Sequence, residues 1–363
     1  MKFLPTSLLG TAAWDEFCRQ SDDAGFRHTS TWIDYTLHMR GPGGSTDLSF
    51  GVMDEGKLVA VAPLIKERIH QRPELFEFGF AGWNIPYPAL INGLGDRHRE
   101  KMTKEIFQEI DRLARQEVIA YAAVEVNPLL SLRDDPPHLC NPLPFLGFHA
   151  TEIATHIIGL DRDEDSLLRD MRKGHKSDIT AARNNGLSGR VFDAASITDD
   201  AFAAYRRLHL RAAGRQTRPD RTWELMHEWI KSGFAVLGIV SGRSGAPLAA
   251  ALCLTYKHAA YYGSSCVDPE FANERGAMHL LLWEVMVHLK AAGLQWFETG
   301  WQHTPTMSQE VPSKKEVAIS HFKRGFGGRN VPYFRGERFY DPEYLREISG
   351  HRVQKWIEEW GVE

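Results

Sequence analysis

The chain has 363 residues, 43% of them hydrophobic and 25% charged, which is enough apolar material for about two ordinary globular domains. The 43 lysines and arginines against 47 aspartates and glutamates leave a net charge of −4, so no overall field draws the chain to nucleic acid or an anionic membrane. We therefore expect polyanions to meet only a local basic patch, and we expect no DNA binding.

The N-terminal sequence and the cysteines indicate the cellular compartment in which we expect the protein. The apolar run after Lys2 is short and is interrupted by Pro5, so we expect no secretion signal. No uncharged apolar stretch approaches the ~18 residues of a membrane span. The four cysteines form no C-x-x-C pair, which argues against a disulfide framework or a zinc site. These features predict a cytoplasmic protein without a bound metal or cofactor.

The first half of the chain reads as a mixed α/β unit. Two strands flank a turn at Asp54–Gly56, which is typical of a β-hairpin over Gly51–Leu64. Apolar residues recur at helical spacing over Asp96–Gln116. A strand at Val118–Val126 follows the predicted helix and contains Glu125.

An aromatic loop, Gly82–Pro88, follows a predicted strand at Phe76–Phe80. Its rigid rings, Trp83 and Tyr87, can wall a substrate cleft. The alternative is a loop that packs on its own domain.

Prolines mark the boundary between the two halves. The stretch from Asp135 to Pro144 is rich in proline, which stops both helices and central strands. We therefore predict an N-terminal domain at residues 1–150 and a C-terminal domain at residues 151–363.

The second half opens with a strand, Thr155–Leu160, and a predicted helix, Glu164–Asn184, that starts with acidic residues and continues with basic ones. We predict that the next helix adds seven basic residues. Guanidinium groups suit phosphate and carboxylate, so this concentration suggests an anion site, and a solvated outer face is the equal alternative. The candidate phosphate ligands are Lys176, Arg211 and Arg215.

The element order of the first half then recurs. A hairpin over Gly238–Leu254 precedes a helix at Gly276–Ala292, and a strand at Leu294–Thr299 contains Glu298. Two α/β units of the same order are therefore expected, although two unrelated hairpins remain the alternative.

The segment Glu274–His279 opens the second-half helix, where a helix N-terminus can hold a pyrophosphate beside Arg275. It contains a single glycine, Gly276, so the phosphate cradle of acetyltransferases is degenerate here and does not establish coenzyme A binding.

The segment Ser320–Gly328 combines two cations, three glycines and two aromatic residues. A lysine held there by phenylalanines, Lys323 beside Phe322, is a partly desolvated cation able to stabilise an oxyanion. The alternative is a glycine-rich turn in which Lys323 faces water. G-x-S-x-G, G-x-x-x-x-G-K-[ST] and G-x-G-x-x-G motifs are missing from the sequence, so hydrolase, nucleoside-triphosphatase and dinucleotide-binding functions lack local support.

Taken in order, these motifs make the sequence resemble the FemAB-type family, whose members are tandem proteins of the Gcn5-related N-acetyltransferase (GNAT) fold. The Phe322-Lys323 segment is the most specific of them. The remaining matches are Trp14, Phe26, Thr31-Trp32, Ala62–Leu64, Leu146–Phe148, Leu160-Asp161, Met171–Ile179, Ala182, Gly186, Tyr261–Ser264 including Tyr262, and Leu281–Glu284.

The resemblance implies an α/β fold of mixed sheets, with two tandem GNAT-like domains and a cleft between them. It implies transfer of an aminoacyl group from charged tRNA, or of an acyl group from acyl-coenzyme A, to an amine. Lys323 would be the cation that stabilises the oxyanion or an acceptor phosphate. Two departures put an arm-dependent tRNA mode in doubt: Lys176 stands where the family often has arginine, and no long helical arm fits between Asn184 and Thr222.

We therefore expect an acyl- or aminoacyltransferase acting on an amine of a nucleotide- or lipid-linked sugar, glycan or peptidoglycan-type precursor. Attack by a neutral amine needs positioning, an oxyanion cation and loss of one proton, which Glu298 or His303 can relay. Glu298 can equally be a structural acid at a strand end. The partners would be the acceptor and a tRNA or acyl-coenzyme A donor, with peripheral access to a lipid-linked acceptor. The alternative function is a noncatalytic module that binds a nucleotide-sugar or RNA.

Overall fold

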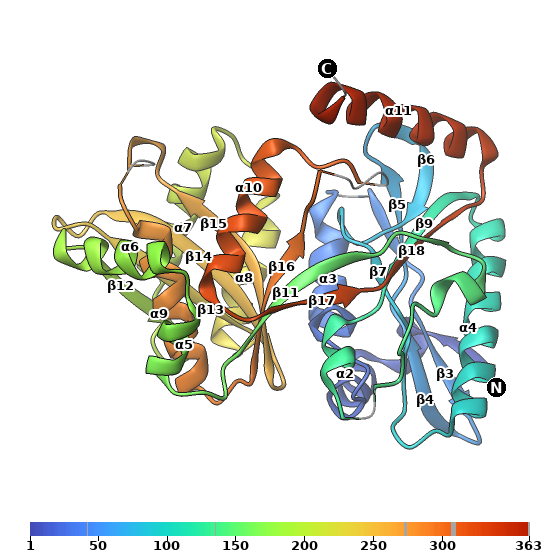
Figure 1. Cartoon of the computed structure of the whole chain (residues 1–363). Helices are drawn as coiled ribbons and strands as arrows, with labels where there is room; N and C mark the ends of the chain where they lie inside the picture. The colour runs from blue at the N-terminus through green and yellow to red at the C-terminus, as the bar shows by residue number, and fades with distance from the viewer. Residues whose placement is uncertain (42, 135, 272–273, 306–309, 362–363) are drawn as a thin grey trace. The chain divides into compact units, whose positions relative to one another are not determined.

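The protein comprises two compact units (Figure 1). The structure, a computed structural model, describes residues 1–41, 43–134, 136–271, 274–305 and 310–361. Unit 1 contains Met1–Ala154, His303–Val317 and Val331–Glu363, and unit 2 contains Thr155–Gln302 and Ala318–Asn330. Asp135, the first residue of the predicted proline-rich boundary, lies outside the described residues.

Unit 1 is built on two sheets. One has the strand order β1-β3-β4-β8, and the other has the order β10-β18-β9-β6-β5-β2, with β7 also pairing with β9. The strands are β1 (Lys2–Pro5), β2 (Ser45–Asp47), β3 (Phe50–Asp54), β4 (Lys57–Ala62), β5 (Ile65–Ile69), β6 (Arg72–Phe78), β7 (Ile85–Pro86), β8 (Ala89–Leu90), β9 (Ile119–Glu125), β10 (His149–Ala150) and β18 (Arg335–Phe339).

The helices of unit 1 follow from capping and amphipathic pattern. In α4 (Asp96–Gln116), the apolar side chains of Met102, Ile106 and Ile110 recur every three to four residues and are buried. This helix has the bounds that the sequence predicted. The other helices are α1 (Thr6–Leu9), α2 (Thr11–Gln20), α3 (Ser30–Met39), whose N-cap Thr29 accepts a hydrogen bond from Trp32 N, and α11 (Pro342–Trp360).

The C-terminal segment clusters with the N-terminal half, whereas the sequence placed all of residues 151–363 in one domain. The reason is strand pairing: β18 lies antiparallel to β9, with Arg335 opposite Glu125 and Phe339 opposite Tyr121. The chain first passes from unit 1 to unit 2 after Ala154, whereas the predicted boundary followed residue 150. Strands paired across more than 200 residues leave no signal in the local sequence. The prolines therefore could not show that the C-terminal segment belongs with the N-terminal half.

Unit 2 is built on one sheet with the order β12-β13-β14-β15-β16-β11-β17. The predicted hairpin at Gly238–Leu254 is present as β13 and β14, which pair antiparallel. The strands are β11 (Ile153–Gly159), β12 (Ser188–Phe192), β13 (Ala235–Ser241), β14 (Pro247–Tyr256), β15 (Ala259–Val267), β16 (Trp296–Gln302) and β17 (Arg329–Tyr333).

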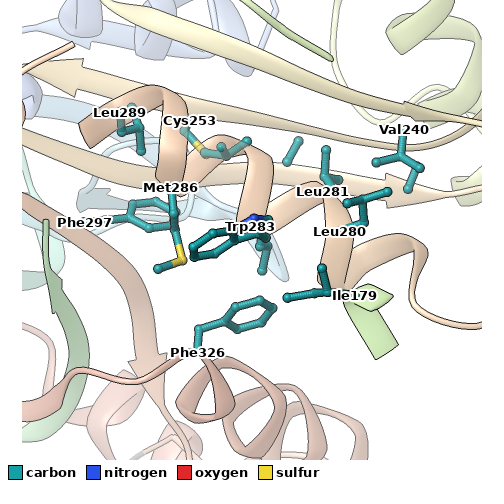
Figure 2. Packing of buried hydrophobic residues seen from close by; sticks show 14 of the residues in the cluster. Ile179, Val240, Cys253, Leu280, Leu281, Trp283, Met286, Leu289, Phe297 and Phe326 are labelled. Atoms are coloured by element: carbon teal, nitrogen blue, oxygen red, sulfur yellow. The ribbon is translucent and has the colours of Figure 1, made fainter. Parts of the chain in front are cut away.

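The core of unit 2 forms between this sheet and α9 (Ala277–Ala291), which buries Leu281, Val285 and Leu289. Figure 2 shows Phe326 facing Ile179 and Trp283 at the edge of this cluster. The other helices are α5 (Glu164–Asp170), α6 (Lys173–Asn184), α7 (Asp199–Ala213), α8 (Asp220–Lys231) and α10 (Lys314–Lys323), the last followed by a 3-10 turn at Arg324–Phe326.

The single helix predicted over Glu164–Asn184 is wrong, because the chain breaks between α5 and α6. Met171 and Arg172 have extended backbones, with ψ of 149° and 144°. The break buries the Met171 side chain and lets the Arg172 amide donate to the Gly325 carbonyl at 2.9 Å. The predicted start is confirmed, since Asp163 caps α5 by accepting from Ser166 N.

The arginine-rich helix predicted next is also wrong as a single element. It is two helices, because α7 ends at Gly214 in a left-handed conformation (φ 65°) and Pro219 precedes α8. Arg215 and Arg218 lie between the two helices.

The two units share an arrangement that the repeat in the sequence predicted. In unit 1, β6 and β9 are parallel, and α4 lies in the connection between them together with the short strands β7 and β8. In unit 2, β15 and β16 are parallel and are joined by α9. The mixed α/β class and the element order of both halves are therefore confirmed. Over the described ranges, every helix is too short or too polar to cross a lipid bilayer.

Candidate functional site

Lys323 is the last residue of α10 and lies half-buried in unit 2. Its Nζ lies 4.9 Å from the ring centroid of Tyr262 on β15. Among the described residues its ammonium makes no ion pair. An ammonium that is removed from bulk water but not neutralised keeps its charge available for a ligand.

Glu298 on β16 is an acid whose charge acts on the pKa of Lys323. The side chain is 9% exposed, and its Oε1 accepts a short hydrogen bond from the Thr155 hydroxyl. Burial lowers the pKa of Lys323 below its ordinary 10.5, and the negative charge of Glu298 opposes that shift. The structure thus brings together Lys323, Glu298 and Tyr262, which the sequence singled out separately.

A β-bulge directs the Tyr262 side chain. The β14–β15 pairing shifts register between Leu252, opposite Ser264, and Cys253, opposite Tyr262, which leaves Gly263 as the extra residue. The Tyr262 hydroxyl donates to Ser265 Oγ at 2.5 Å, and burial raises the pKa of the phenol. The ring therefore stays neutral beside the ammonium and offers it a π-face.

A histidine on α6 fixes the end of α10. His175 Nε2 lies 2.9 Å from the Phe322 carbonyl, and because a carbonyl only accepts, this nitrogen carries the proton. Burial lowers the pKa of His175, and burial with the adjacent His175 lowers the pKa of His279 to about 4. The two neutral rings pack edge to face at 4.5 Å, and Phe322 packs against both. Phe322 thus contributes to positioning the helix end.

A glycine leaves room for the ammonium. Gly300 has φ of +98°, and a Cβ atom there would lie 3.0 Å from Lys323 Nζ. We expect Gly300→Ala to cost about 1 to 2 kcal/mol of stability through backbone strain and also to displace Lys323. The loss of transfer activity should therefore exceed what a drop in folded fraction accounts for. Activity per folded molecule, with the folded fraction taken from circular dichroism, measures this.

Gly293→Ala is the matched control for that variant. Gly293 also has a left-handed φ (+81°), but a Cβ there meets nothing within 4 Å. Both variants should lose similar stability, and only Gly300→Ala should lose activity per folded molecule. Equal activities would mean that the space beside Lys323 has no role.

The N-terminus of α9, the predicted pyrophosphate position, is covered by α6. A Cβ atom at Gly276 would lie 2.1 Å from the Asp178 carbonyl oxygen. Arg275 Nε donates to Asp178 Oδ1 at 2.7 Å and its Nη2 donates to Ser177 Oγ at 3.2 Å. The charge of Arg275 is therefore already matched by a carboxylate of its own unit.

The predicted phosphate ligands are dispersed over unit 2. Arg211 on α7 forms an ion pair with the buried Asp268 at 2.6 Å. Lys176 is half-buried and donates to the Arg169 carbonyl at 3.3 Å, while Arg215 is exposed in the α7–α8 connection. Lys176 lies on the basic α5–α6 segment, and Arg211 belongs to a separate ion pair.

His303, the alternative proton relay, clusters with unit 1, whereas Lys323 and Glu298 belong to unit 2. Burial works against ionisation of Glu316, but hydrogen bonds from Ser313 and the charges of His303 and Lys355 lower the pKa of this carboxyl. His303 therefore lies within electrostatic reach of Glu316.

The aromatic loop of unit 1 divides into two parts. Tyr87 is 7% exposed and packs against Phe107 and His138, with ring centroids 5.5 and 5.1 Å away, so it is part of the core. Trp83 is half-buried, carries the Arg27 guanidinium 4.3 Å from its ring centroid and lines a cavity. Only Trp83 is placed to meet a ligand.

Sequence reasoning missed the charged groups that line this same cavity in unit 1. They come from strands and helices far apart in the chain, and no local spacing could have identified them. The lining comprises Glu77, Phe78, Gly79, Gly82, Trp83, Asn84, Tyr121, Ala123, Thr151, Ile153, Glu310, Arg335, Glu337 and Arg352.

Comparisons with known proteins agree with this architecture. Residues 169–307 match the acetyltransferase (GNAT) domain family. A comparison with curated proteins found no match. Among solved structures, the crystal structure of FemX superimposes with a TM-score of 0.65 at 13% identity, covering 96% of this chain and 100% of FemX.

Two further structures extend over nearly the whole chain. L-PGS from Bacillus licheniformis has a TM-score of 0.58 at 11% identity, covering 95% of this chain and 96% of its own. The C-terminal domain of a protein from Agrobacterium fabrum, named as a lysylphosphatidylglycerol synthetase, has a TM-score of 0.56 at 14% identity and covers 96% and 98%. The chain therefore shares the fold of these structures, as its motifs predicted, and residues 169–307 match the GNAT acetyltransferase domain family.

Proposed function

We propose that this protein transfers an aminoacyl group from charged tRNA to an amine of a nucleotide- or lipid-linked sugar, glycan or peptidoglycan-type precursor. The observation that carries the proposal is the half-buried Lys323 ammonium, which forms no ion pair among the described residues. Charge that develops on a carbonyl oxygen during acyl transfer is stabilised by such a preorganised cation.

In the proposed reaction the acceptor amine attacks the ester carbonyl of the donor. The new C–N bond forms as the carbonyl becomes a tetrahedral oxyanion beside Lys323. The oxyanion then collapses, the bond from carbon to the donor ribose oxygen breaks, and that oxygen takes a proton while the amine loses one. Burial lowers the pKa of Lys323, and the negative charge of Glu298 opposes that shift and so favours the charged form. Glu298, which belongs to the same unit as Lys323, is the candidate for the proton relay.

Two observations favour an aminoacyl-tRNA donor over acyl-coenzyme A. The start of α9, whose amides a pyrophosphate needs, is covered at Gly276 by the Asp178 carbonyl of α6. In contrast, the α5–α6 segment carries four basic residues within eight positions: Arg169, Arg172, Lys173 and Lys176. None of them forms an ion pair with a carboxylate among the described residues. The Arg172 guanidinium also donates to the His321 carbonyl, which places this basic segment beside the end of α10. One of the similar structures is named as a lysylphosphatidylglycerol synthetase, a name that describes a lysyl group joined to phosphatidylglycerol. That name fits aminoacyl transfer.

Donor binding is tested by thermal shift with aminoacyl-tRNA and with acetyl-coenzyme A. A ligand at 100 times its dissociation constant adds about 2.7 kcal/mol to stability. We expect the tRNA to stabilise the protein and the effect to weaken as salt rises, because phosphate contacts release counterions. Lys173→Glu on α6 should reduce this stabilisation more than Lys57→Glu, an exposed lysine at the start of β4 that makes the same change in net charge.

Transfer itself is tested by mass spectrometry of candidate aminosugar and peptide acceptors after incubation with each donor. An aminoacyl mass added to the acceptor supports the proposal. An acyl mass obtained from coenzyme A would replace the proposed donor. Binding of a donor or acceptor without any change in acceptor mass would identify a noncatalytic binding module.

A further inference from the structure

Unit 1 contains a polar cavity of about 180 Å³ that the transfer chemistry does not use. Its walls are β6, β9, β18, the loop Gly79–Asn84 and the helix α11, which lies beside β6 and β9 in Figure 1. An apolar cavity of about 150 Å³ holds a molecule of benzene. The volume in unit 1 is therefore suited to a single six-membered ring with a few substituents.

The two arginines of the lining, Arg335 and Arg352, each form an ion pair with a glutamate of the lining. Arg335 is 5% exposed and holds Glu310 with hydrogen bonds of 2.6 and 3.4 Å. Arg352 holds Glu337 in a two-pronged ion pair, and the Tyr121 hydroxyl donates to the same carboxylate at 2.7 Å. Because each guanidinium already faces a carboxylate, neither is free to bind an anionic ligand.

The amide of Asn84 completes the first of these pairs. With its oxygen turned toward the guanidinium, Asn84 accepts from Arg335 Nε at 2.8 Å. The wall around Arg335 is thus satisfied on several sides and is expected to keep its shape before a ligand binds.

Two polar groups of the lining are left without partners. The Glu77 carboxyl makes no hydrogen bond or ion pair with any residue that the structure describes. Thr151 is 4% exposed, and its hydroxyl has no hydrogen-bond partner among the described residues. Three carboxyl groups (Glu77, Glu310, Glu337) against two arginines leave the lining with an excess of one negative charge when all are ionised.

We propose that this cavity binds a ring-sized primary amine, with the ammonium paired to Glu77. A cation neutralises the one unpaired carboxylate, and a hydroxyl on the same ring can satisfy Thr151. Buried charges and polar groups are costly unless paired, so such a ligand would match both unpaired groups of the lining. The site goes beyond the proposed transfer reaction, because it lies wholly in unit 1 and is stated as a binding site only.

The ionisation of Glu77 makes binding depend on pH. Burial, reinforced by the charge of Glu67 and opposed by Arg40, raises the pKa of Glu77 from 4.5 to about 7. Two phenols, Tyr121 and Tyr344, also face this carboxyl, and burial raises the pKa of both, so they stay neutral near pH 7. An alkyl ammonium keeps its proton up to about pH 10. Affinity for the ammonium should therefore rise as pH increases through about 7, because Glu77 must ionise to pair with it.

The test compares two probes of the same size on the full chain. Trans-4-aminocyclohexanol carries an ammonium and a hydroxyl, and trans-1,4-cyclohexanediol replaces the ammonium by a second hydroxyl. Isothermal titration at pH 8 should give an affinity at least about tenfold higher for the amine. At pH 5.5 the preference should shrink by at least about tenfold, since Glu77 is then mostly protonated.

Variants of β6 separate Glu77 from general charge effects. Glu77→Gln should remove the preference for the amine, whereas Glu74→Gln, which removes an exposed carboxylate from the same strand, should keep it. Equal binding of the two probes, no detectable binding of either, or an unchanged preference in Glu77→Gln would each overturn the proposal. Lys323→Met should retain the preference, so a failure of the transfer reaction and a failure of this site are distinguished.

Discussion

Replacing Lys323 by methionine is expected to slow acyl transfer by about 100- to 1,000-fold, the loss typical of removing one oxyanion-stabilising group. The effect should fall on kcat rather than on KM, because the oxyanion exists only in the transition state. Methionine keeps the unbranched shape that fits beside Tyr262 and Gly300. Mass-spectrometric initial rates at several acceptor concentrations give both constants.

Folding of this variant should be intact. Burial lowers the pKa of Lys323, so the folded state holds the charged lysine at a cost, and an uncharged side chain removes that cost. The melting temperature should match the wild type or exceed it. Lys315→Met, which alters an exposed lysine on the same helix, is the control and should retain full activity. Wild-type turnover in Lys323→Met would exclude this lysine from the chemistry.

Glu77→Gln is expected to stabilise unit 1 above pH 7 by up to about 3 kcal/mol. The pKa of Glu77 is raised from 4.5 to about 7, and each tenfold change in proton affinity corresponds to about 1.4 kcal/mol. The folded state binds the proton more tightly than the unfolded state, so this carboxyl lowers stability as pH rises from about 4.5 to 7, and the full cost is present above 7. Glutamine has nearly the same shape and carries no charge.

Because the protein comprises two compact units, the measurement should report on unit 1 alone. Hydrogen exchange of amides in β6 and β9, followed by mass spectrometry at pH 8 and again near pH 5, meets this need. The variant should exchange more slowly than wild type at pH 8 and similarly near pH 5. Glu74→Gln on the same strand should show no such pH-dependent gain. Faster exchange in Glu77→Gln at pH 8 would reveal that the ionised carboxylate stabilises the fold.

The sequence alone was sufficient where a signal is periodic or local. The bounds of α4 follow from apolar residues spaced three to four apart, and the hairpin strands β13 and β14 follow from two apolar runs on either side of a turn that contains glycine. The start of α5 follows from the acidic residues that open it, and Asp163 caps this helix. Lys323 could be selected as a cation because glycines and phenylalanines surround it in the sequence.

Tertiary structure decided which groups meet and which charges remain unpaired. The break between α5 and α6 serves a contact between Arg172 and Gly325, which are more than 150 residues apart in the sequence. The ion pair of Arg275 with Asp178, and the burial of Tyr87, are likewise set by neighbours from other elements.

The cavity of unit 1 is the clearest case. Tyr121 and Glu337, separated by 216 residues, are joined because β18 returns to pair with β9. Local patterns report the period of an element and the identity of its caps, since both depend on neighbours along the chain. The partner of a buried charge depends on strand order and on the route of the chain between units, and that information exists only once the chain has folded.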